Sequence, residues 1–116
     1  MKGKYLLADF SLQAGLMGYN AAALARKFQV EERTARRWLA GKAAPPLPIQ
    51  SEIDNLFQDF LDAVAETTDT MDENGGVLKF TLDATSPGAA QRVALMRAIY
   101  LEFALTDLNA EIHFKP

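Results

Sequence analysis

The sequence predicts a mainly α-helical protein in which a helix-turn-helix bundle precedes a small strand-helix-strand unit. The first part is indicated by residues 21–46, where apolar residues recur at helical spacing and Gly and Pro bound the segment. The second part is indicated by two alternating apolar segments that flank a long apolar one after residue 76. We therefore expect two domains, which span residues 1–68 and 76–116.

The composition limits the classes of protein to which the chain can belong. With 116 residues, 49% of them hydrophobic, the chain suffices for one compact domain or two small lobes. It has no cysteine, so no disulfide framework and no thiolate metal site is available. The apolar stretch after Lys2 and Lys4 is interrupted by Asp9 and is too short for a secretory segment or a membrane span. We expect a cytoplasmic protein with no cofactor and no membrane partner.

The charge is divided between the two halves of the chain. Residues 1–46 carry eight Lys or Arg against three Asp or Glu, a net charge of +5. Residues 47–116 carry four against twelve, a net charge of −8. Five of the eight basic residues of the first half fall between Arg26 and Arg37. Because a basic cluster attracts phosphates, we expect a polyanion to approach the first half only.

The first apolar segment spans residues 4–17, and we expect it to form a buried helix. A short strand over residues 5–10 remains open as an alternative. Gly18 ends the segment. Its apolar residues are Tyr5, Leu6, Leu7, Phe10, Leu12, Leu16 and Met17.

A second helix is predicted from Ala21, since Asn20 stands where an N-cap belongs. Its small alanines allow a second helix to approach closely, and a bulky residue at Ala25 would displace that helix. Val30 is expected to fill the turn. The next helix is predicted from about Glu31 to Ala40.

This third helix is predicted to be amphipathic. Acidic residues in its first turn interact favourably with the helix dipole, and Gly41 ends it. Its predicted inner face consists of Ala35, Trp38 and Leu39. Its predicted outer face consists of Glu32, Arg33, Arg36, Arg37 and Ala40.

The two helices and their turn resemble the Cro and lambda-repressor type of regulator, the XRE-like helix-turn-helix family. The resemblance covers roughly residues 5–66. At one position the chain departs from the family, which usually has Gly in the turn where this chain has Gln29. The matching pattern consists of Ala25, Val30, Thr34, Trp38, Gly41 and Pro45.

The resemblance implies binding to double-stranded DNA through the third helix. Arg33 and Arg37, one turn apart, are expected to bind guanine O6 and N7 in the major groove. Arg36 and Lys42 are expected to contact phosphates. Thr34 is a candidate to contact a thymine methyl group. Glu32 is a candidate to accept a hydrogen bond from a cytosine amino group, or it serves only as a partner of the helix dipole. A protein-interaction scaffold without DNA binding is the competing interpretation.

The remaining elements are predicted from prolines and apolar periodicity. Three prolines within residues 43–50 make a stiff connection, after which Ser51 is expected to cap a helix through about Thr67. Its apolar face is expected to pack under the helix-turn-helix. The polar residues 67–76 then separate the two domains. The apolar face consists of Ile53, Leu56, Phe57, Phe60, Leu61 and Val64, and the acidic face of Glu52, Asp54, Asp59, Asp62 and Glu66.

After residue 76 the pattern predicts a strand over Val77 to Leu82, a helix from Ser86 to about Leu105, and a second strand over residues 110–115. Two strands are not stable alone, so we expect this unit to pair with a second copy of the chain. Packing of the unit on the first domain in a monomer is the alternative.

The sequence as a whole favours a phage-type transcriptional regulator, a homodimeric repressor of an inverted-repeat operator. Two alternatives remain open: an antitoxin-type regulator whose second domain binds a partner protein, and an adaptor without DNA binding. No catalytic or metal-binding constellation is evident, since the only histidine, His113, lies on a predicted strand. An enzyme is therefore not expected.

Overall fold

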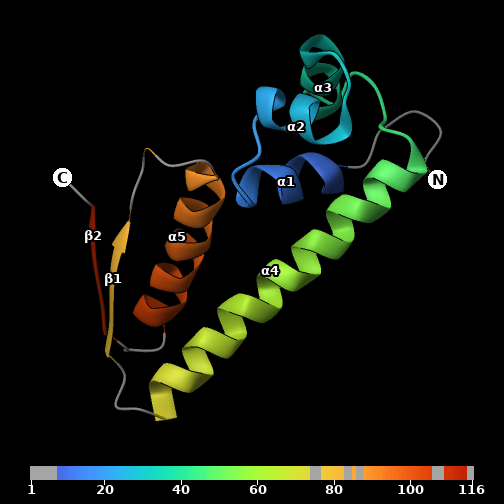
Figure 1. Cartoon of the computed structure of the whole chain (residues 1–116). Coiled ribbons are helices and arrows are strands. Elements are labelled where there is room, and N and C mark those ends of the chain that lie inside the picture. Colours follow the sequence, from blue (N-terminus) through green and yellow to red (C-terminus); the bar gives the residue numbers. More distant parts are fainter. Residues whose placement is uncertain (1–7, 74–76, 83–84, 86–87, 106–108, 115–116) are drawn as a thin grey trace. The chain divides into compact units, whose positions relative to one another are not determined.

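The protein is mainly helical in a computed structural model that describes residues 8–73, 77–82, 85, 88–105 and 109–114 (Figure 1). The predominance of helix confirms that the protein is mainly α-helical, as the sequence predicts. The chain forms two compact units, residues 1–58 and 59–116. The sequence predicts a boundary after residue 68, whereas this division of the chain falls within one continuous helix, residues 47–73.

The first unit contains three short helices and the beginning of a long one. The short helices are α1 (Asp9–Leu16), α2 (Ala21–Phe28) and α3 (Glu32–Leu39). The long helix, α4 (Leu47–Glu73), continues into the second unit. Helices α2 and α3 are joined by a turn of three residues (Figure 1).

The core of the first unit forms around an aromatic pair. The ring of Phe10 on α1 meets the ring of Trp38 on α3 edge to face, with centroids 6.0 Å apart and an interplanar angle of 86°. The Ser11 hydroxyl donates a hydrogen bond to the carbonyl of Leu39 at 2.7 Å, which also ties α1 to α3. Among the described residues of this unit, the buried hydrophobic ones are Phe10, Ala14, Met17, Leu24, Ala35, Trp38 and Ile53.

The sequence predicts a buried first helix, but two of its leucines are exposed. Leu12 and Leu16 are exposed by 62% and 60%, because they lie one turn apart on the side of α1 opposite to Phe10 and Ala14. Residues 5–7, which the sequence places in this helix, lie outside the described residues. The first part of the alternative strand over residues 5–10 therefore also lies outside them.

Helix α4 is longer at both ends than the sequence predicts. It begins at Leu47 instead of Ser51, since Pro48 fits a first turn, where no backbone donor is needed. The carbonyl of Pro46 accepts hydrogen bonds from the backbone N–H groups of Ile49 and Gln50, at 3.0 and 3.1 Å. At the other end the helix passes the expected stop at Thr67, and the Thr68 hydroxyl donates to the Val64 carbonyl at 2.9 Å.

The two faces of α4 differ in exposure as their composition predicts. Ile53 is fully buried, and Leu56, Phe57, Phe60 and Val64 are half-buried, whereas Leu61 is exposed by 44%. The carboxylates of the opposite face are all exposed: Glu52, Asp54, Asp59, Asp62 and Glu66. No helix in the part of the chain that the structure describes has the length and apolar character needed to cross a membrane.

The second unit consists of the end of α4, strand β1 (Val77–Leu82), helix α5 (Ala89–Leu105) and strand β2 (Asn109–Phe114). The strands pair in parallel, with Val77 opposite Asn109 and Leu82 opposite Phe114. A parallel pair needs a crossover connection, and α5 lies on that connection. The expected cap at Ser86 and Pro87 lies outside the described residues, and the predicted end at Leu105 is confirmed.

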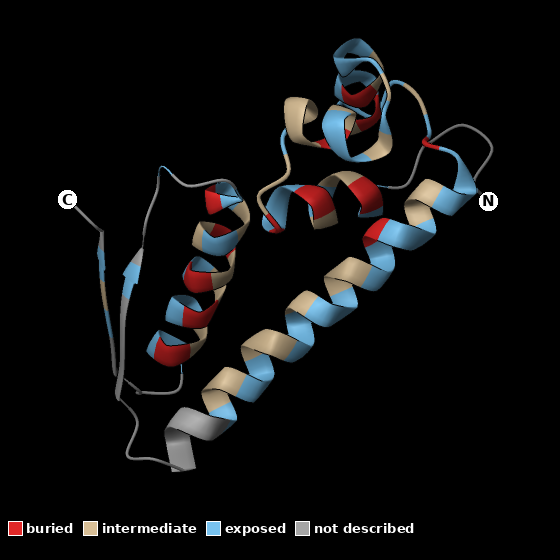
Figure 2. Cartoon of the chain, in the orientation of Figure 1, coloured by how far each residue is buried: buried red, intermediate tan, exposed pale blue. Residues whose placement is uncertain are grey.

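Helix α5 supplies the core of the second unit. Met96, Ile99 and Phe103 form a buried cluster, against which Val64 of α4 and Ile112 of β2 pack, together with Val93 and Leu95. Figure 2 shows buried and exposed residues alternating along this helix. The exposed side carries three large apolar residues, namely Tyr100 (56%), Leu101 (59%) and Leu105 (72%).

Candidate nucleic-acid interface

The exposed side of α3 carries the most concentrated positive charge of the first unit. Glu32, Arg33, Arg36 and Arg37 are all exposed there, and we call these four residues the α3 face. The opposite side of the helix is anchored in the core, because Ala35 is 0% and Trp38 only 6% exposed. The anchored side fixes the rotation of the helix about its axis and therefore the direction of the arginines.

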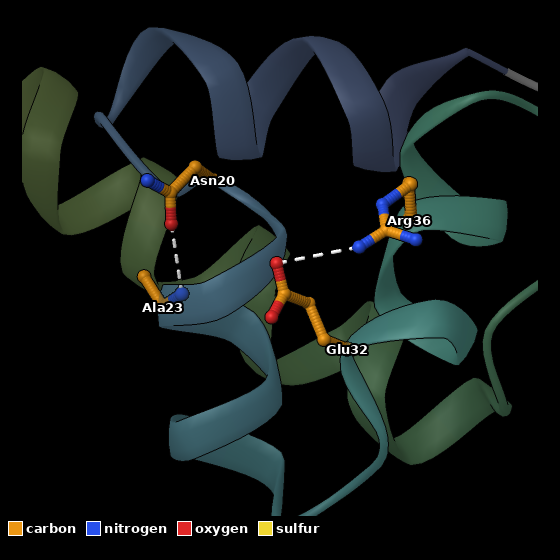
Figure 3. Close-up of polar contacts among 4 residues, drawn as sticks. All are labelled: Asn20, Ala23, Glu32 and Arg36. Carbon is orange, nitrogen blue, oxygen red and sulfur yellow. Dashed lines mark hydrogen bonds and ion pairs between the residues drawn. The ribbon is translucent and has the colours of Figure 1, made fainter.

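Local sequence signals fix the beginning of α2 and the end of α3. The Asn20 side chain accepts a hydrogen bond from the backbone N–H of Ala23 at 2.8 Å, which confirms the predicted N-cap (Figure 3). Gly41 adopts a φ of +74°, and its N–H donates to the carbonyl of Trp38 at 3.2 Å. The N–H of Lys42 donates to the carbonyl of Arg37 at 2.9 Å. These two bonds form a Schellman motif, which ends α3 as predicted.

The turn between α2 and α3 depends on Gln29, which adopts the left-handed conformation with φ 55° and ψ 48°. Among the described residues it is the only non-glycine with a positive φ. The N–H of Val30 crosses the turn and donates to the carbonyl of Ala25 at 3.1 Å. Gln29 thus adopts a backbone conformation that glycine adopts without steric cost.

The α3 face consists of two neighbouring rows, each one turn long. In one row Glu32 Oε1 lies 3.4 Å from Arg36 Nη2, an i,i+4 ion pair between side chains exposed by 55% and 64% (Figure 3). In the other row Arg33 and Arg37 have no charged partner among the residues that the structure describes. One arginine of the face is therefore paired within the helix, and two are available to an external anion.

The two remaining predicted site residues lie beside the α3 face. Thr34 is half-buried, at the border between the anchored and the exposed sides of the helix. Lys42 is exposed and follows the Schellman motif, where its backbone is held by the bond to Arg37. The structure thus brings all six predicted residues onto α3 and the residues that follow it: Glu32, Arg33, Thr34, Arg36, Arg37 and Lys42.

Sequence reasoning did not distinguish the two basic residues at the end of α2. Lys27 Nζ lies 3.8 Å from a Glu52 carboxylate oxygen on α4 and 5.7 Å from the centre of the Phe28 ring. Arg26 is exposed and has no charged partner in the described ranges. The charge cluster in the sequence indicated both residues, whereas the pairing of Lys27 depends on a fold contact with α4.

Among the described residues of the second unit, the carboxylates and the histidine form no comparable site. His113 Nε2 lies 3.0 Å from Glu111 Oε1, and both side chains are exposed on β2. No group of three or more His, Asp or Glu residues within the described residues is arranged to hold a metal ion.

Comparisons with models of protein families, with curated proteins and with solved structures give no match for this chain.

Proposed function

We propose that the protein is a sequence-specific DNA-binding regulator that inserts α3 into the major groove of duplex DNA. The observation that carries this proposal is the geometry of Arg33 and Arg37. They are exposed, one turn apart, without a charged partner among the described residues, and on a helix whose other side is anchored by Ala35 and Trp38. A rigid helix with two available guanidinium groups suits bidentate recognition of base edges. On this proposal the chain is a regulator of the Cro and lambda-repressor type.

The other residues of the interface have separate roles in the proposal. Arg36 and Lys42 contact phosphates and set the position of α3 on the duplex, whereas Arg33 and Arg37 bind guanines. Thr34 contacts a thymine methyl. The exposed carboxylates of α4 keep the rest of the chain away from the phosphates, since like charges repel.

The proposal includes a homodimer formed by the second unit. A sheet of two strands is marginally stable alone, and the exposed side of α5 carries Tyr100, Leu101 and Leu105 in neighbouring turns. A second copy of the chain would cover these residues across a two-fold axis. Two copies of α3 would then enter major grooves about 34 Å apart, or a multiple of that distance, on an inverted repeat. A cytoplasmic dimer bound there represses transcription by blocking polymerase.

Selection of binding sites from a random duplex pool tests the proposal. The wild-type chain should enrich an inverted repeat with guanine at two positions of each half-site. Arg33→Ala and Arg37→Ala should each lose the preference at one of these positions, at a cost of about 1–3 kcal/mol in discrimination. The two variants serve as controls for each other, because each should leave the other's guanine preference intact.

Enrichment of no sequence by the wild-type chain, or of the same sequence by all three proteins, would contradict the assignment of α3 as the reading helix. The first of these results would favour an adaptor that binds proteins in place of DNA.

A further inference from the structure

The ion pair on the α3 face involves one arginine, and the other two arginines of the face have no charged partner in the described ranges. Glu32 and Arg36 are separated by 3.4 Å, and both side chains are more than half exposed. Neither group takes part in the cap of the helix, since α3 begins without a side-chain capping bond. The pair is therefore not needed to satisfy the backbone at that end of α3.

Two acidic residues, Glu31 and Glu32, stand at the beginning of α3. Glu31, at the N-cap position, is exposed and carries the same charge as Glu32 next to it in sequence. Either carboxylate interacts favourably with the helix dipole. Only Glu32 lies one turn before an arginine of the face, where i,i+4 side chains meet. Glu32 therefore pairs with Arg36, whereas the position of Glu31 does not bring it to an arginine of the face.

We propose that Glu32 is a specificity-determining residue that withholds Arg36 from DNA other than the operator. A phosphate that approaches Arg36 has to displace the Glu32 carboxylate and is repelled by it. Binding to non-operator DNA depends almost entirely on phosphate contacts, so this competition weakens it directly. In the operator complex a cytosine amino group donates to the carboxylate, and Arg36 is released to a phosphate. This inference rests on the proposed function.

The test compares Glu32→Ala with Glu31→Ala in the full-length protein, by fluorescence anisotropy over a range of salt concentrations. One duplex carries the selected operator and the other a scrambled sequence of the same composition. Both variants remove one negative charge from the start of α3, but only Glu32→Ala releases Arg36. Glu31→Ala is therefore a matched control for net charge, and thermal unfolding of each variant verifies that the fold is intact.

Glu32→Ala should raise the affinity for the scrambled duplex by roughly three- to tenfold and steepen the slope of log K against log salt by about 1.8, the value for two further phosphate contacts, one from each copy of the dimer. Its affinity for the operator should not rise. Glu31→Ala should change the affinity for the scrambled duplex less than twofold and leave the slope unchanged. In the background of Arg36→Ala, the further change Glu32→Ala should no longer steepen the slope.

The inference is overturned if the two single variants raise the affinity for the scrambled duplex equally, or if Glu32→Ala steepens the slope as much without Arg36 as with it. Either result means that Glu32 acts through general repulsion. In both cases the wild-type protein still binds the operator, so the proposed function stands. A wild-type protein that binds neither duplex at low salt contradicts the proposed function itself.

Discussion

A single residue, Gln29, determines the direction in which α3 leaves α2. Its left-handed backbone lets the chain reverse within three residues, and the bond from Val30 to the carbonyl of Ala25 closes the turn. A side chain in this conformation brings Cβ close to the following carbonyl, which costs roughly 1–2 kcal/mol. The turn therefore keeps the shape that glycine would give it, at some cost in stability.

Replacing Gln29 by glycine should stabilise the first unit. Removal of the steric cost outweighs the greater backbone entropy that glycine gives the unfolded chain, so we expect the free energy of unfolding of Gln29→Gly to rise by about 0.5–1 kcal/mol. Urea titration followed by the fluorescence of Trp38, the only tryptophan, measures this change.

The matched control is Gly41→Ala, at the left-handed position that follows α3, where φ is +74°. It should lower the free energy of unfolding by about 1 kcal/mol, because alanine acquires the cost that Gln29→Gly removes. A decrease in stability for Gln29→Gly would show that the Gln29 side chain contributes more than its backbone conformation costs.

The residues at helix ends were largely predictable, since their signals are local. Asn20 and Gly41 have side chains and backbone preferences that act within a few residues, and both stand where the sequence predicts a cap and a stop. The pairing of Glu32 with Arg36 also follows from i,i+4 spacing, although the prediction treated Glu32 as a base contact or a dipole partner. The ion pair of Lys27 with Glu52 was not predictable, because those residues meet only in the fold.

At the scale of the elements, α3 is held by small residues as well as by Trp38. The sequence indicates Ala25 as the alanine that must stay small, yet Ala25 is half-buried, whereas Ala35 is 0% exposed. Ala35 therefore tolerates less added volume than Ala25 does.

Ala35→Leu should destabilise the first unit by about 1–3 kcal/mol, because three additional carbon atoms have to enter a closed space. Ala40→Leu adds the same atoms at an exposed position just after α3 and should change the free energy of unfolding by less than about 0.5 kcal/mol. Equal effects of the two variants in urea titrations would show that α3 is not anchored through Ala35.

The ends of α4 were predicted less well than its faces. Apolar periodicity marks Ile53 and its neighbours correctly, since the spacing of three and four residues follows from helix geometry. The stop at Thr67 was wrong, because the polar residues after it have no Gly or Pro before residue 74 and can continue a helix whose earlier turns are already formed. Polarity alone does not end a helix.

At the scale of the whole molecule, the sequence predicts both strands of the second unit but does not predict that they pair with each other. The alternation of apolar and polar residues predicts each strand separately. It does not predict that β1 and β2 are neighbours, because their pairing joins residues that α5 separates along the chain. The exposure of Leu101 and Leu105 could not be predicted either, because α5 is apolar on most sides and its sequence does not mark one side as exposed.

The proposed dimer can be tested by placing a charge on the exposed side of α5. Leu101→Asp should raise the dimer dissociation constant by at least about tenfold, because a carboxylate would be buried at the seam. Sedimentation velocity of the full-length chain measures the change. Leu12→Asp, at a position of nearly equal exposure on α1, is the matched control and should leave the dimer intact. A dimer that survives Leu101→Asp but is lost with Leu12→Asp would move the interface to the first unit.

The central claim, that the exposed side of α3 binds duplex DNA, is tested most directly by the salt dependence of binding. The wild-type affinity for the operator duplex should fall by roughly a hundredfold between 50 and 200 mM salt, because each copy of the dimer contacts phosphates through Arg36 and Lys42. Arg33→Ala with Arg37→Ala should reduce the affinity at low salt at least about tenfold. Lys79→Ala with Lys115→Ala, which removes the same charge from the second unit, should have little effect. Equal binding by both double variants, or no salt-dependent binding by the wild-type chain, would contradict the claim.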